Sequence, residues 1–267
     1  MAGVVGAALG AARRPRPGRA WLLLLASLSL AACATVPAPR PLPPEAEAAR
    51  ARLERRWQAF SDLRTLANIE IRRGERSERL AGVLLLRAPA SLRFEGLSPF
   101  GPPILLVSAS GDGVTVWEVL KNRAYLLPSS PEANRRWLGL ALGAEDLVAL
   151  LSGHALPMRE PLAGAMLPAD ESGPSLSLSG ADGSQRIWLD PETGRTRRVE
   201  WTGGKSPLRV SFTGGGPAEP PTGLTLATLD GRLVVRVRYQ GPQLDSGFDP
   251  ELMRLTVPQG VEIQDFR

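Results

Sequence analysis

Side chains able to do chemistry are scarce in this 267-residue chain. It contains one histidine, His154, one cysteine, Cys33, and two tyrosines. Transition-metal sites need several histidine or cysteine ligands, and a disulfide needs a second cysteine, so neither is expected. The sequence therefore predicts a protein that folds and works without a metal or a cofactor.

A Ser-His-acid catalytic triad would have to use His154, the single histidine of the chain. No serine lies in the Gly-x-Ser-x-Gly pattern of the α/β-hydrolase nucleophile. His154 follows an apolar segment and Gly153, which is typical of the turn after a helix. A hydrolase is therefore the least favoured function, and the sequence predicts a protein that is not an enzyme.

Asp245 and Asp249 flank Ser246, Gly247 and Phe248 and superficially resemble a calcium-binding loop. The ligand spacing of an EF-hand and its closing glutamate are missing. Aspartate and glycine clusters usually form turns, because the carboxylate bonds to nearby backbone groups. We expect a turn here and no metal site.

The formal charge of +5 comes mostly from the N-terminus. The first 32 residues contain four arginines and no acid, which leaves 28 basic against 27 acidic side chains in the rest of the chain. Nucleic-acid binding relies on clustered cationic groups, so this nearly neutral body argues against it. Solvated strand faces are expected for the following arginines, with anionic lipid headgroups as an alternative contact: Arg197, Arg198, Arg232, Arg236 and Arg238.

The first 32 residues have the order of an export signal. Arginines precede an apolar stretch at residues 21–30, and Ala31 and Ala32 follow. A helix that spans a bilayer needs about 20 apolar residues, so this stretch is too short for one. We expect residues 1–32 to be a cleaved signal peptide.

Residues 30–33, with the sequence Leu-Ala-Ala-Cys, are similar to the lipobox of bacterial lipoproteins. This resemblance implies that Cys33 is acylated and becomes the first residue of the mature protein. Ala34 follows it, and under the enteric sorting rule a residue other than aspartate implies the outer membrane. The alternative is an uncleaved signal anchor that carries a chance cysteine.

The mature chain divides into a tether and one domain. Residues 33–44 contain five prolines, which stiffen the chain toward polyproline II, and residues 45–267 form the predicted domain. A first helix is expected over residues 45–62. Its apolar stripe consists of Ala49, Leu53, Trp57 and Phe60.

Strands dominate from Thr65 onward, where apolar and polar side chains alternate with a period of two. Turn signals separate these strands at residues 111–113, 182–183, 190–194, 202–204 and 230–231. Short links can join only antiparallel neighbours, so we expect an antiparallel meander and not a Rossmann-type sheet. Further helices are predicted at residues 144–152 and 134–140.

The order of these features resembles the LolA/LolB superfamily of periplasmic lipoprotein carriers. The LolB-like part covers residues 45–157, with a Pro-hydrophobic-Gly loop at residues 98–101 and an apolar helix followed by Gly and Pro at 146–157. Residues 188–201 resemble a hairpin of the wider superfamily, and residues 255–261 its last strands. The resemblance implies an α+β fold: a curved antiparallel β-sheet, or open half-barrel, covered by a few helices.

Two predicted strands, residues 80–86 and 104–107, have apolar side chains on both faces. Such a strand is either covered on both faces or lines a cavity. The pattern is consistent with a lipid pocket under the helices and also with a filled core. The candidates for a lipid pocket are Ile69, Ile71, Leu84, Leu86, Leu92, Phe94, Ile104 and Leu106.

Phe100 lies in the predicted loop between Pro99 and Gly101. A lone phenylalanine most often packs into the core. The resemblance implies the opposite, an outward side chain that touches the membrane or an incoming lipoprotein. Both positions are open at this point.

Together these observations favour a lipid-anchored protein on the periplasmic face of the outer membrane. It would bind acyl chains or lipoproteins as a chaperone in lipoprotein localisation, with a soluble periplasmic carrier as a further partner. A related uncharacterised branch of the superfamily fits equally well. The alternative function is a non-catalytic scaffold or peptide-binding lipoprotein of an envelope complex.

Overall fold

The computed structural model describes residues 41–267, apart from 112, 205–206 and 216–218. The helices are α2 (Pro44–Ala59), α3 (Pro131–Leu138), α4 (Ala144–Leu151) and the short 3₁₀ helices η2 (Val119–Lys121) and η3 (Pro250–Met253). The strands are β1 (Asp62–Arg73), β2 (Arg76–Arg87), β3 (Ser91–Leu97), β4 (Pro103–Ser110), β5 (Gly113–Glu118), β6 (Arg123–Leu127), β7 (Ala163–Asp170), β8 (Gly173–Gly180), β9 (Gly183–Leu189), β10 (Thr196–Thr202), β11 (Leu208–Thr213), β12 (Gly223–Thr228), β13 (Leu233–Leu244) and β14 (Glu262–Asp265). No helix within the described ranges has both the length and the apolar composition that crossing a membrane requires.

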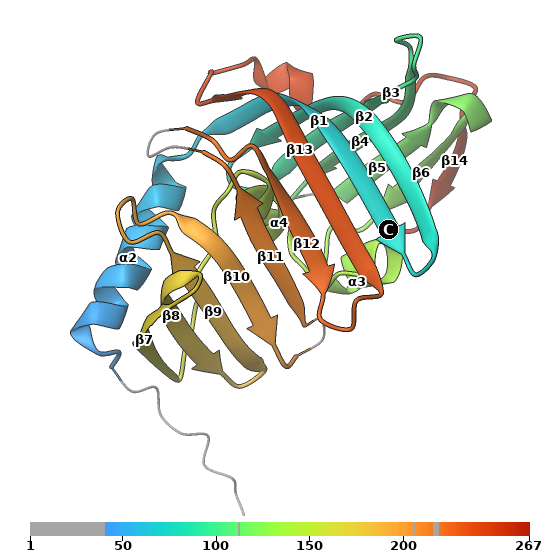
Figure 1. The fold of residues 1–267 in the computed structure, drawn as a ribbon. Helices are drawn as coiled ribbons and strands as arrows, with labels where there is room; N and C mark the ends of the chain where they lie inside the picture. The colour runs from blue at the N-terminus through green and yellow to red at the C-terminus, as the bar shows by residue number, and fades with distance from the viewer. Residues whose placement is uncertain (1–40, 112, 205–206, 216–218) are drawn as a thin grey trace, which may run out of the picture. The chain divides into compact units, whose positions relative to one another are not determined.

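The 14 strands of the described residues form one curved sheet (Figure 1). Its order is β14-β6-β5-β4-β3-β2-β1-β13-β12-β11-β10-β9-β8-β7, and neighbours are antiparallel except for β14 with β6. The chain meanders from β1 to β6, passes through α3 and α4 to the opposite edge at β7, and meanders back to β13. The predicted curved antiparallel α+β fold is confirmed.

The first helix forms where the sequence predicts it. Pro44 occupies its first turn, where a missing N–H costs nothing, and two glutamates in that turn suit the helix dipole. The helix ends at Ala59, before the predicted boundary at Asp62, because Phe60 is already extended and Asp62 begins β1. The buried face of α2 consists of Ala46, Ala49, Leu53 and Trp57.

Three small residues form one cross-strand row on the inner side of the sheet. Ala67, Gly82 and Gly96 are cross-strand neighbours on β1, β2 and β3. A Cβ atom at Gly82 would lie only 2.0 Å from the carbonyl oxygen of Glu95, so no larger residue fits without a backbone shift. These strands can therefore approach closely and bend.

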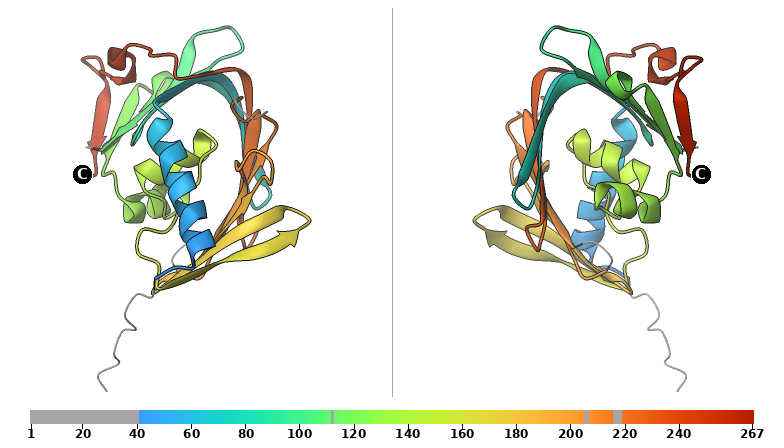
Figure 2. Two further views of the ribbon diagram at one scale, coloured as in Figure 1. Left: turned by 90° about the vertical axis from the view of Figure 1, so that its left-hand side faces the viewer. Right: turned by 90° about the vertical axis from the view of Figure 1, so that its right-hand side faces the viewer.

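The helices α2, α3 and α4 lie on the inner side of the curve, as both views in Figure 2 show. Helix α2 packs against β7 and β8, and α4 packs against β2 and β3. We call the face of the sheet toward the helices the inner face and the opposite one the outer face. The main hydrophobic core lies between the helices and the inner face.

The segment after β13 crosses the outer face. The Ser108 hydroxyl donates to the carbonyl of Met253 at 2.9 Å, and Arg93 donates to the carbonyl of Arg254. The prediction of a closing strand at residues 255–261 is wrong, since regular pairing begins only at Glu262. Pro258 lacks the N–H that a strand ladder needs, and a turn follows it at residues 259–260.

Candidate functional site

The inner face has two regions that differ in packing. One group of inner side chains on β8–β11, the filled inner surface, is completely buried: Leu176, Leu178, Ile187, Val199 and Val210. The other group, the open inner surface on β3–β5, is apolar but only partly covered: Leu92, Leu105, Val107, Ala109, Val114 and Val116.

The filled inner surface is covered by α2 and by the linker that follows α4. Gln185 is only 1% exposed. Its side chain accepts from the backbone N–H of Met158 at 2.7 Å and donates to the carbonyl of Leu156 at 2.7 Å. A buried amide has to be paired, so these two bonds hold the linker against β9.

Tyr239 joins the same cover to β13. Its hydroxyl donates to the carbonyl of Leu151, the last residue of α4, at 2.6 Å. Burial raises the pKa of Tyr239, so the phenol stays protonated and remains a donor. The end of α4 is therefore fixed to the sheet.

The open inner surface is built by cross-strand pairing. Val107 pairs with Val116, and Ala109 with Val114, so their side chains share one face of β4 and β5. The polar groups at its edge bond to each other, since the Tyr125 hydroxyl donates to Glu118 at 3.1 Å. An aliphatic surface of this kind offers contact area without hydrogen bonds, which is what an acyl chain needs.

Six of the predicted pocket residues lie on the inner face: Ile69, Ile71, Leu84, Leu86, Leu92 and Phe94. Leu84, Leu86 and Phe94 are buried in the core, whereas the other three are half-buried beside it. Of the six, only Leu92 belongs to the open inner surface as defined above.

The register separates Ile104 and Leu106 from the other six candidates. Leu106 pairs with Glu95 and alternates with the inner-facing Leu105 and Val107, so it points to the outer face. It is 7% exposed because the segment after β13 crosses this part of the sheet. The two apolar faces of β4 thus have separate covers and do not line one pocket.

The pocket residues predicted from the sequence do not include Leu105, Val107, Val114 or Val116. Val114 and Val116 alternate with Thr115 and Trp117, so the period-two pattern of a strand with one apolar face was present. The sequence pattern does not indicate that the helices cover β2 and β3 more fully than β4 and β5.

Phe100 takes the outward position, with 94% of its surface exposed. The loop that carries it is tight: Ser98 accepts the N–H of Phe100 on its hydroxyl and that of Gly101 on its carbonyl. Gly101 has φ of +103°, which side-chain-bearing residues rarely adopt. The loop thus holds the Phe100 side chain in solvent. Cys33, the predicted acylation site, lies outside the described residues.

His154 and Ser152 are 3.0 Å apart, which raises the question of a nucleophile and its base. Ser152 is 2% exposed and donates its hydroxyl proton to the carbonyl of Ala149. The bond to His154 therefore needs the proton on Nδ1, so this nitrogen donates to the serine and cannot act as its base. Burial and the positive charge of Arg56 lower the pKa of His154 to about 4.

Asp245 lies at a bend and bonds to a distant segment, not to the nearby backbone groups of the predicted turn. It accepts from the backbone N–H and the hydroxyl of Ser61 at 2.7 and 2.9 Å, and Asp62 in return accepts from the backbone N–H groups of Ser246 and Gly247. These bonds fasten the end of β13 to the start of β1. The described part of the chain holds no cluster of three potential metal ligands.

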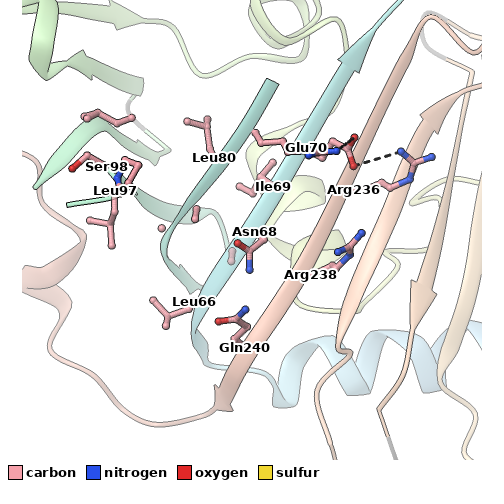
Figure 3. A pocket seen from close by; sticks show the side chains of 16 residues that line it. Leu66, Asn68, Ile69, Glu70, Leu80, Leu97, Ser98, Arg236, Arg238 and Gln240 are labelled. Atoms are coloured by element: carbon pink, nitrogen blue, oxygen red, sulfur yellow. Dashed lines mark ion pairs between the residues drawn. The ribbon is translucent and has the colours of Figure 1, made fainter. Parts of the chain in front are cut away.

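The outer face carries a groove of about 760 Å³ over β1, β2 and β13. Figure 3 shows Arg236, Arg238 and Gln240 from β13 beside Asn68 and Glu70 from β1. The groove is bounded by Leu97, Ser98 and Pro99, which lead into the Phe100 loop. It is thus a second concave surface, on the face opposite the open inner surface.

No family profile and no curated protein sequence matches this chain. Solved structures do match its fold. A DUF1329 family protein from Desulfovibrio piger is 12% identical with a TM-score of 0.58, over 79% of this chain and 96% of that one. A domain described for outer membrane lipoprotein sorting in Vibrio parahaemolyticus is 12% identical with a TM-score of 0.54, over 78% and 97%.

A LolA superfamily protein from Nitrosomonas europaea is 11% identical to this chain with a TM-score of 0.51, over 79% of this chain and 97% of that one. Identities this low carry information on the fold alone. The matches extend over nearly the full length of the solved chains, beyond residues 45–157, to which the sequence resemblance was strongest. The described residues thus have the LolA/LolB-like fold.

Proposed function

We propose that this chain is a lipid-anchored envelope protein that binds acyl chains, or lipoproteins that carry them, in outer-membrane lipoprotein localisation. The observation that carries the proposal is the open inner surface: aliphatic, half-covered and enclosed by a curved sheet. The lipoprotein-sorting description of the similar Vibrio domain supports the same class of function.

In the proposed mechanism, Cys33 and the tether at residues 33–44 hold the domain at the periplasmic face of the outer membrane. A soluble carrier delivers acyl chains to the open inner surface, where each buried methylene contributes about 0.8 kcal/mol. Release needs a second apolar environment to replace the first. In this proposal the exposed Phe100 makes that contact with the bilayer.

The transfer involves no bond breaking. The only histidine donates to Ser152 through Nδ1, and the serine proton is already engaged with a backbone carbonyl. This pair fits a structural role after α4. The proposal therefore assigns the protein a carrier function and no enzymatic one.

The test is competitive binding of a fluorescent acyl probe to the full chain with Cys33→Ala, which removes the predicted acylation site. Val116→Gln should weaken probe binding about tenfold, since it places an amide among aliphatic side chains at a cost near 1.4 kcal/mol. Val83→Gln is the matched control, because Val83 is also half-buried but lies on the outer face. Equal affinities of the two variants would contradict the proposed site.

A scaffold or peptide-binding function is the second candidate, and the edge of the sheet favours it. Strand β7 ends the sheet, so one side of it pairs with no other strand of the described residues. An extended peptide can add to such an edge through backbone bonds. This function would be supported over the first if the purified chain contains no lipid but holds a stable protein partner. The Ala165→Pro substitution on β7 should then abolish binding of that partner.

A further inference from the structure

The sheet register arranges the outer groove in rows. One row runs from Arg238 on β13 through Asn68 on β1 and Ala81 on β2 to Leu97 on β3. The short side chain of Ala81 leaves room between the polar end of this row and its apolar end. The groove is thus cationic at β13 and apolar where it meets the Phe100 loop.

The next row has more positive than negative charge. Glu70 is the one acid of the groove and lies between two arginines, 3.6 Å from Arg79 and 3.7 Å from Arg236. These long, exposed pairs contribute little attraction. Arg238 has no ion-pair or hydrogen-bond partner within the described ranges, and neither do the side-chain amides of Asn68 and Gln240.

The outer face of β8–β11 shows the opposite arrangement. Arg186 bonds to Asp170 at 2.8 Å, and Arg198 and Arg209 both bond to Glu200, at 2.9 and 2.7 Å. Arg186 and Arg198 also lie over the ring of Trp188, at 4.3 and 4.6 Å from its centre. Each of these three arginines has a carboxylate partner at normal bonding distance. In the outer groove Arg79 and Arg236 share Glu70 at longer distances, and Arg238 has no described partner.

We propose that the outer groove docks onto an anionic lipid bilayer, with Arg236 and Arg238 on headgroup phosphates and Phe100 in the apolar layer. Guanidinium groups pair well with phosphate oxygens, and the amides of Asn68 and Gln240 add donors. A cationic surface that adjoins an exposed apolar tip is suited to the boundary between headgroups and acyl chains. This inference rests on the proposed function only for the role of the Phe100 loop.

The test uses the full chain with Cys33→Ala and a fluorophore on Leu66→Cys, a half-exposed position in the groove. The chain is bound to vesicles that contain lipid with a spin label on the headgroup, which quenches a fluorophore nearby. Quenching should be strong in vesicles of phosphatidylcholine with phosphatidylglycerol and weak in phosphatidylcholine alone. It should also fall as salt is added.

Arg238→Gln should reduce the ratio of docked to undocked protein about fivefold, and Arg236→Gln with Arg238→Gln about 25-fold, from the attraction of each arginine to an anionic surface. Arg55→Gln is the matched control: it removes an exposed arginine without a described partner on α2. Equal quenching in the two kinds of vesicle, or an equal loss with Arg55→Gln, would overturn the proposal.

Acyl-probe binding by the same variants separates this inference from the proposed function. The groove and the open inner surface lie on opposite faces, so Arg236→Gln with Arg238→Gln should leave probe affinity unchanged. If the double variant loses both vesicle docking and probe binding, the substitutions disturb the whole domain, and the assignment of the groove fails. Docking without probe binding would support the groove and contradict the acyl site.

Discussion

The filled and the open inner surface are made from the same material, alternating aliphatic residues on antiparallel strands, yet only one of them is fully covered. The difference lies in what packs on top. The filled inner surface is covered by α2 and by a linker that Gln185 holds, whereas on the other side α4 packs mainly against β2 and β3. An apolar strand face therefore shows that a cover is needed, but the covering elements decide whether the face is a core or a binding surface.

The first prediction tests whether water is excluded from His154, next to the cover of the filled inner surface. His154 has a pKa of about 4 in the folded state, against 6.5 as its ordinary value. Between these pH values the imidazole is protonated in the unfolded chain but neutral in the folded one. The free energy of unfolding should therefore fall by roughly 3 kcal/mol as the pH drops from about 6.5 to about 4. Urea unfolding across this range measures the loss, and His154→Gln should remove this part of it. An unchanged pH dependence in the variant would mean that water reaches the imidazole.

A matched pair of valines sharpens the comparison next. Val199 on the filled inner surface is 0% exposed, so Val199→Ala should lower the free energy of unfolding by about 2–3 kcal/mol through lost burial and a new cavity. Val116→Ala on the open inner surface should cost less than about 1 kcal/mol. Denaturant unfolding of both variants decides it, and equal costs would remove the distinction between the two surfaces.

Loss of the hydrogen bond that attaches α4 to β13 should lower the free energy of unfolding by a smaller amount. Tyr239→Phe removes the donor to the Leu151 carbonyl and leaves that carbonyl unpaired. We expect a loss of about 1–2 kcal/mol in thermal or urea unfolding. If α4 is a fixed part of the cover, hydrogen exchange at its end should rise in the variant, whereas unchanged exchange would show that other contacts hold it.

The smallest expected change in stability is at the Phe100 loop. Phe100→Glu alters a side chain that is 94% exposed, so the free energy of unfolding should stay within about 0.5 kcal/mol. Insertion of lipoproteins into membranes should nevertheless be impaired, because a carboxylate resists entry into the apolar layer. Leu252→Glu, at an exposed leucine after β13, serves as the control. A Phe100→Glu variant with full transfer activity would end the case for the loop.

The sequence was sufficient for the strand order within each meander, because short turns leave only antiparallel neighbours. It also located the three α-helices of the described residues to within a few residues. The start of α3 shows the limit: the helix begins at Pro131, before the predicted residue 134, since Ser130 caps it by accepting the N–H of Ala133. A serine directly before a proline is a typical helix start, so this boundary is encoded locally in the sequence.

The candidate site could be predicted only in part, for reasons of geometry. Alternation tells which residues share a face, and it grouped Ile69 with Ile71 and Leu84 with Leu86 on the inner face. It does not tell which face of a doubly apolar strand is the inner one, and for Ile104 and Leu106 the pairing with β3 gave the outer one. The cover of Leu106 comes from a segment about 145 residues away along the chain, which no local pattern reveals.

The pairing of β1 with β13 has a consequence for the order of events during biogenesis. Contacts such as those from Asp62 to Ser246 join residues 184 positions apart, and they lie in the middle of the sheet. Loops of this length close slowly, and their contacts form only after the chain between them is available. Nearly the whole polypeptide must therefore be delivered before the two meanders can unite. For the export predicted from residues 1–32, this order means that the two meanders stay separate until the last strands have been synthesised.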